Sequence, residues 1–109
     1  MRNFVGENLL IRIFIAEGDR FEHRPLYEAL VEMLRKEGFA GATVLRGVSG
    51  FGAHSVYHSQ KLLDLSADLP MIIEAVESEE KINAVMPRID AMMSGGMVTM
   101  EKVKVIRYR

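Results

Sequence analysis

Residues 9–16, Leu9-Leu10-Ile11-Arg12-Ile13-Phe14-Ile15-Ala16, decide the fold. The stretch is short, apolar and rich in β-branched side chains, which predicts a β-strand. Successive side chains of a strand point to opposite faces, so the three isoleucines share one face and Leu10, Arg12 and Phe14 share the other. Both faces of the strand are therefore largely apolar, and each face needs a cover.

Two amphipathic helices are predicted further along the chain. Pro25 suits the first turn of the first helix, where a missing N–H costs nothing, and Gly38 ends that helix. Ser78 is a good N-cap for the second helix, which Gly95 and Gly96 end. Each helix carries a one-sided apolar stripe: Leu26, Leu30, Met33 and Leu34 in the first, and Ile82, Val85, Met86, Ile89, Met92 and Met93 in the second.

Three further strands are predicted at residues 43–48, 69–76 and 97–109. The order β-α-β-β-α-β is the ferredoxin-like α+β sandwich, an antiparallel four-stranded sheet with two helices on one face. We expect residues 1–109 to form one such domain. The strand at 69–76 is also largely apolar on both faces, and the helices can cover only one face. A second copy of the chain is the predicted cover of the other face, so we expect a homo-oligomer.

The composition limits the classes of function. The 109 residues carry 14 Lys and Arg against 15 Asp and Glu, so they lack the broad basic field of a nucleic-acid binder. There are no cysteines, which excludes disulfides, thiolate chemistry and Cys-based zinc sites. No stretch approaches the roughly 20 apolar residues of a membrane span, and residues 1–8 do not resemble a signal peptide. We therefore expect a cytoplasmic protein that is not membrane-inserted and binds no nucleic acid.

Residues 41–52, Gly-Ala-Thr-Val-Leu-Arg-Gly-Val-Ser-Gly-Phe-Gly, hold four glycines in twelve residues. Glycine lets a ligand approach the main-chain N–H groups closely, so a strand that ends in Gly-Phe-Gly is a candidate anion cradle. The segment lacks the Gly-Lys-Ser/Thr ending of a Walker loop and the spacing of a dinucleotide fingerprint. The alternative interpretation is a bulge or turn where the strand leaves the sheet.

The Gly-x-Thr-Val start and the Gly-Phe-Gly end of this segment resemble the PII signal-transduction proteins. With Arg46-Gly47 and Asp68-Leu69-Pro70, the chain is more similar still to the PII-like family known as domain of unknown function 190, from residue 9 to the C-terminus. The resemblance implies a ferredoxin-like fold and a homotrimer. It also implies an adenine nucleotide in clefts between subunits, where nucleotide state sets the shape of a loop.

The resemblance extends to individual site residues. It implies that the nucleotide is bound by Thr43, Gly50, Phe51, Gly52, Gly95, Gly96, Arg107 and Arg109. Lysines of PII proteins are replaced by Met71 and Met97, and the basic residues after Gly-Phe-Gly are absent, although Arg46 could substitute for one of them. ADP or AMP therefore suits the remaining charge better than ATP. The alternative for Arg107 and Arg109 is a solvated, charged terminus.

The resulting hypothesis is a regulatory protein, not an enzyme, that requires no cofactor. Residues 53–66 would form a loop that signals nucleotide occupancy to a partner, for which a membrane transporter is one candidate. The first alternative is a metal-handling trimer like CutA, because His54 and His58 are spaced to share one face of a helix. The second is a small hydrolase, but no catalytic triad is present, and Asn3 and Asn83 do not stand where an acylphosphatase needs an asparagine.

Overall fold

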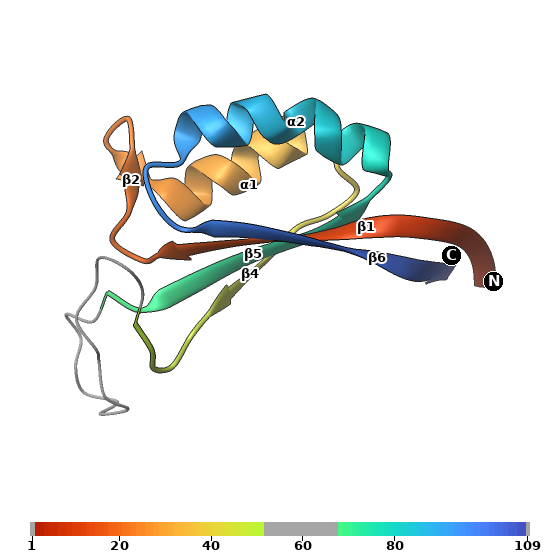
Figure 1. The fold of residues 1–109 in the computed structure, drawn as a ribbon, viewed down its shortest axis with the longest axis horizontal. Helices are drawn as coiled ribbons and strands as arrows, with labels where there is room; N and C mark the ends of the chain where they lie inside the picture. Colours follow the sequence, from red (N-terminus) through yellow and green to blue (C-terminus); the bar gives the residue numbers. More distant parts are fainter. Residues whose placement is uncertain (1, 52–67, 109) are drawn as a thin grey trace.

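The computed structural model describes residues 2–51 and 68–108, and its four main strands form one antiparallel sheet. The strand order is β4-β5-β1-β6, and both helices cover the same face (Figure 1). The predicted ferredoxin-like order β-α-β-β-α-β is therefore confirmed. The elements are β1 (Arg2–Ala16), α1 (Leu26–Lys36), β4 (Thr43–Arg46), β5 (Pro70–Glu77), α2 (Glu79–Met92) and β6 (Met97–Tyr108).

The core lies between the helices and the covered face of the sheet. Along β5 the side chains alternate strictly between buried and half-buried, as expected of a strand with one covered face. The largest side chains that are fully buried come from the middle strands and from the predicted helix stripes: Ile11, Ile13, Leu26, Leu30, Leu34, Ile73, Ile82 and Ile89. The predicted stripes therefore point inward.

The helix ends follow the local chemistry closely. Pro25 is the N-cap of α1, one residue before the predicted first turn, since its ψ of 131° is extended rather than helical. At the other end of α1, the Gly38 N–H donates to the Arg35 carbonyl and the Phe39 N–H to the Leu34 carbonyl, which is a Schellman motif. The Ser78 hydroxyl accepts a hydrogen bond from the Lys81 N–H at 3.2 Å, as predicted for an N-cap.

Sequence reasoning placed the start of the first strand too late. β1 begins at Arg2, not at residue 9, because its first half pairs with the second half of β6 in a two-stranded ribbon that extends beyond the helices (Figure 1). The pairing register shifts at Gly6, and polar residues there hide the strand pattern. The bounds of the other strands agree with the predicted ones to within two residues. β4 ends at Arg46 rather than at residue 48, and β5 is shifted by one residue from residues 69–76.

A small hairpin between β1 and α1 was also missed. Strands β2 (Arg20–Phe21) and β3 (Arg24–Pro25) are joined by Glu22 and His23, whose φ angles are 49° and 68°. Positive φ at both central residues is the geometry of a type I′ turn, which asparagine and glycine prefer. The sequence therefore carries no turn signal at this position.

Among the residues that the structure describes, Glu77 is the one polar side chain that is buried. Its Oε2 accepts a hydrogen bond from the Ala40 N–H at 2.8 Å and lies 4.0 Å from the Lys81 ammonium. Lys81 in turn donates to the Gly38 carbonyl at 2.7 Å. The end of β5 is thereby tied to the connection between α1 and β4.

Replacing Glu77 with Ala is expected to destabilise the protein by about 1–3 kcal/mol, because the Ala40 N–H loses a charged acceptor. Urea unfolding measures the change. The matched control is Glu80→Ala, since Glu80 is exposed in the first turn of α2 and should lose only its interaction with the helix dipole. Equal stability of the two variants would contradict the role of Glu77.

Candidate functional site

The glycine-rich segment after β4 packs against the start of β5. The Gly47 N–H donates to the Pro70 carbonyl at 2.7 Å, which holds the chain beside β5 after the last strand residue, Arg46. Gly50 has a φ of 150°, and a Cβ there would lie 3.0 Å from Cγ of Pro70. Phe51 follows with 69% of its surface exposed. The predicted turn therefore exists, and its glycines allow it to lie close to the sheet.

The second glycine pair lies at the same end of the sheet. Gly95 and Gly96 form the turn between α2 and β6, and Gly96 has a φ of 91°. A Cβ on Gly96 would overlap the carbonyl oxygen of Phe14, so the turn is pressed against the end of β1. Since Ala16 pairs with the first residue of β5, both glycine turns flank one end of the sheet.

Thr43 and Arg107 lie elsewhere, on the face of the sheet that the helices leave open. Thr43 pairs with Glu74 on β5, and Arg107 pairs with Asn3 in the β1–β6 ribbon. Both side chains line one cavity of about 660 Å³. Its other walls come from the α1–β4 connection, β1, β5 and β6: Leu10, Ala40, Gly41, Ala42, Glu74, Ala75, Val76, Val103, Lys104, Val105 and Ile106.

One chain therefore divides the predicted site residues into two groups. Gly96 and Arg107 stand at opposite ends of β6, and eleven residues of strand span about 36 Å. A single nucleotide cannot contact both Gly96 and Arg107 of one chain. The first group is Arg46, Gly50, Phe51, Gly95 and Gly96, and the second is Thr43 and Arg107. Gly52 and Arg109 lie outside the described residues.

Arg46 already has an acidic partner. Its Nη2 donates to Oε1 of Glu17 at 2.9 Å, and both side chains are partly exposed. Sequence reasoning missed Glu17, because nothing in the pattern of residues 17–19 indicates which cation lies opposite. Lys104, three residues before Arg107 on β6, was likewise missed among the residues that line the cavity.

The open face of the sheet is mostly apolar. Cross-strand pairs place Leu10 beside Val76 and place Ile72 between Phe14 and Leu45. Leu45 and Met97 expose 43% and 53% of their surfaces. No element among residues 2–51 and 68–108 covers this face, as Figure 1 shows for the helices on the opposite side.

One ion-pair cluster lies in the middle of that face. Arg12 donates from Nε to Glu74 at 2.7 Å and from Nη1 to Glu101 at 3.1 Å. Arg12 and Glu74 are also cross-strand partners on β1 and β5. The hydrogen bond to Glu74, followed by the weaker contribution of Glu101, raises the pKa of Arg12 above its ordinary value. The cluster leaves one surplus negative charge on the face.

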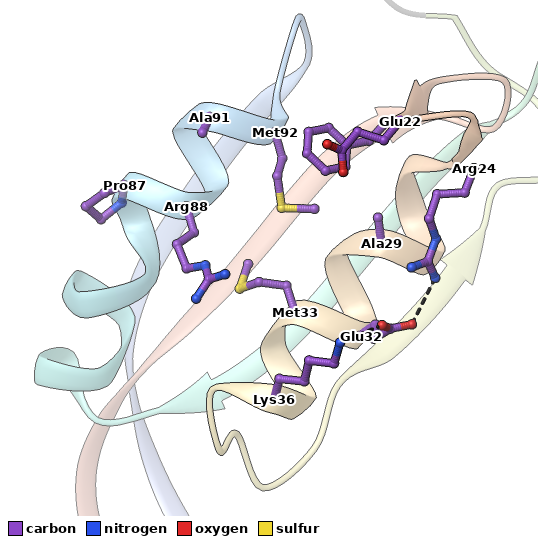
Figure 2. A pocket seen from close by; sticks show the side chains of 11 residues that line it. Glu22, Arg24, Ala29, Glu32, Met33, Lys36, Pro87, Arg88, Ala91 and Met92 are labelled. Atoms are coloured by element: carbon purple, nitrogen blue, oxygen red, sulfur yellow. Dashed lines mark hydrogen bonds and ion pairs between the residues drawn. The ribbon is translucent and has the colours of Figure 1, made fainter.

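The second cavity is a groove of about 590 Å³ between the outer sides of α1 and α2 (Figure 2). Met33 and Met92 face each other across it. On its rim, Arg24 and Lys36 each lie 3.0 Å from Glu32, and together they lower the pKa of that carboxyl group. The groove contains none of the predicted site residues.

The part of the chain that the structure describes contains no group of three or more His, Cys, Asp or Glu side chains that could hold a metal ion. His54 and His58, on which the CutA-like alternative depends, lie outside the described residues. Within the same described part, neither helix is long and apolar enough to cross a membrane.

The family is shown by a direct match. The family model described as DUF190, "Uncharacterized ACR", matches residues 8–105. The chain belongs to the DUF190 family. A UPF0166 protein of Aquifex aeolicus is 37% identical to this DUF190 chain over 102 residues, which cover 94% of the chain and 96% of the relative. A UPF0166 protein of Methanocaldococcus jannaschii is 37% identical over 90 residues, 82% of each chain.

Solved structures with the same fold are PII-like proteins. CPII of Thiomonas intermedia, bound to ADP and bicarbonate, has a TM-score of 0.58 and 23% identity, and the match covers 96% of this DUF190 chain and 91% of CPII. A PII-like signaling protein of Thermus thermophilus has a TM-score of 0.66 and 19% identity, with coverages of 92% and 90%. The PII-like fold expected from the sequence is therefore confirmed.

Proposed function

We propose that this DUF190 protein is a PII-like regulator that binds ADP or AMP in clefts between the subunits of a homotrimer. The separation of the two residue groups carries the proposal. If the glycine turns at one end of the sheet and Arg107 near the other end act on one ligand, they must come from different chains. The apolar open face supports assembly, because a second copy would bury it.

The number of cations near the proposed site favours a nucleotide with one or two phosphates. The cavity beside Thr43 is lined by Arg107, and the glycine turns are accompanied by Arg46. Met71, the second residue of β5, and Met97, the first residue of β6, lie near those turns and add no charge. Paired cations match a mono- or diphosphate better than a triphosphate. The structures of CPII bound to ADP, AMP and bicarbonate agree with this choice.

The role that we propose is regulatory rather than catalytic. We also propose that residues 1–109 form a single domain that carries out this role. The structural relatives of the chain include CPII, a nitrogen regulatory PII-like protein. We propose that occupancy of the cleft is signalled through residues 53–66 to a partner protein in the cytoplasm, with a membrane transporter as one candidate. Such signalling requires that the nucleotide bind one state of that segment better than another.

Replacing Arg107 with Gln is expected to weaken ADP binding by about 10- to 100-fold, because a charge-assisted hydrogen bond to phosphate is lost. Isothermal titration calorimetry measures the affinity. Lys102→Gln is the matched control, since Lys102 is an exposed cation of β6 that does not line the cavity. Unchanged binding by Arg107→Gln, or an absence of heat when ADP and AMP are added to the wild-type protein, would contradict the proposal.

A further inference from the structure

The turn after β1 contacts both sides of the connection between β4 and β5. On one side, Glu17 accepts from Arg46, the last residue of β4. On the other side, the Glu17 N–H donates to the Leu69 carbonyl at 2.8 Å. The Gly18 N–H donates to Oδ1 of Asp68 at 2.5 Å. Two consecutive residues therefore hold the residues that precede and follow this connection.

The ion pair in this arrangement is weak enough to be displaced. The Arg46 side chain is 53% exposed and that of Glu17 is 31% exposed, and exposed pairs of this kind contribute little to stability. A phosphate group offers several acceptor oxygens to the planar guanidinium and can be bound through two parallel hydrogen bonds. An anion beside Gly47 would therefore attract Arg46 more strongly than Glu17 does.

We infer that Glu17 is the resident counter-ion of Arg46 and that nucleotide binding breaks this pair. The inference rests on the proposed function, because it requires an anion at the turn that begins with Gly47. Glu17 then lowers the affinity of the site, since each binding event must first separate the two side chains. Glu17 also makes the site sensitive to the position of the turn after β1.

The backbone contacts carry the change beyond the site. Glu17 holds the Leu69 carbonyl through its own N–H, and its neighbour Gly18 lies so close to Asp68 that a Cβ at Gly18 would be 3.0 Å from Oδ1. When Glu17 loses Arg46, its ion pair to the end of β4 is gone, while the contacts to Asp68 and Leu69 remain. Nucleotide binding therefore releases the end of β4 from the turn after β1, while the residues before β5 stay bound to that turn.

Calorimetry with ADP on the wild-type protein, Glu17→Gln and Glu28→Gln tests the inference. Glu28 is an exposed glutamate of α1, so its replacement removes the same charge without breaking the pair of Arg46 with Glu17. We expect Glu17→Gln to bind ADP about two- to fivefold more tightly than the wild type, the range that the strength of an exposed ion pair allows. Glu28→Gln should bind as the wild type does, and Arg46→Gln should bind more weakly.

The amide resonance of Gly18 in ¹⁵N-labelled protein gives a second readout that does not depend on affinity. We expect ADP to shift it in the wild type, and Glu17→Gln to show part of that shift before ADP is added. Unchanged or weaker ADP binding by Glu17→Gln, with normal binding by the wild type, would overturn the role of Glu17 and leave the proposed function standing. An absence of ADP and AMP binding by the wild type would overturn both.

Discussion

Replacing Ile72 with Asp is expected to convert the proposed trimer into monomers. Ile72 lies in an inner strand of the open face, where cross-strand pairs place it between Phe14 and Leu45. The nearby Arg12 is already paired with Glu74 and Glu101, so a new carboxylate there would lack a cation of its own. Burying it costs several kcal/mol, and about 3 kcal/mol already weakens an interface more than a hundredfold. Size-exclusion chromatography with light scattering measures the mass of the assembly.

The matched control for this experiment is Ala84→Asp. Ala84 is exposed on α2, so the new charge stays in water on the outer side of the molecule. The control should keep the mass of the wild type and its ADP binding, whereas Ile72→Asp should lose both. A variant with Asp at position 72 that remains a trimer would show that the open face is not the interface.

Replacing Gly96 with Ala is expected to lower the thermal midpoint by at least about 10 °C. Alanine at the observed φ of 91° is strained by about 1–2 kcal/mol, and its Cβ would overlap the carbonyl oxygen of Phe14, which is backbone and cannot turn away. Relieving such overlap typically costs a further 1–3 kcal/mol, and each kcal/mol corresponds to roughly 4–8 °C in a domain of about this size. Circular dichroism during heating measures the midpoint.

Gly41→Ala is the control for the effect of adding a methyl group at a glycine. Gly41 has an ordinary φ, and a Cβ there meets nothing within 4 Å. We expect its midpoint to stay near that of the wild type. Equal unfolding temperatures of Gly96→Ala and Gly41→Ala would contradict the close contact between the Gly96 turn and the Phe14 carbonyl of β1.

The parts of the fold that sequence predicted are those with a strong periodic signal. The stripe of the first helix buries as expected, whereas in the second stripe Ile82, Val85 and Ile89 are buried and Met86, Met92 and Met93 are only partly buried. The caps at Gly38 and Ser78 form the expected hydrogen bonds. The first half of β1 has no such signal, because it pairs only with β6 outside the core. The Glu22–His23 turn was missed because neither residue is the asparagine, aspartate or glycine that signals a type I′ turn.

For the candidate site, the sequence predicted the two glycine turns but not which other residues lie near them. The turn at Gly50 and the turn at Gly96 lie at one end of the sheet, which follows from the topology once it is known. Their separation from Arg107 follows from the length of β6, and the pairing of Arg46 with Glu17 depends on side-chain positions. Such contacts between distant segments leave no pattern in a single sequence.

The central claim is that adenine nucleotide binds between subunits of a trimer, and native mass spectrometry tests it most directly. Wild-type protein and Ile72→Asp are sprayed with and without ADP. We predict a wild-type trimer that takes up to three ADP molecules and an Ile72→Asp monomer that takes none. A wild-type trimer that takes no ADP, or a monomer that binds ADP as tightly as the trimer, would contradict the account.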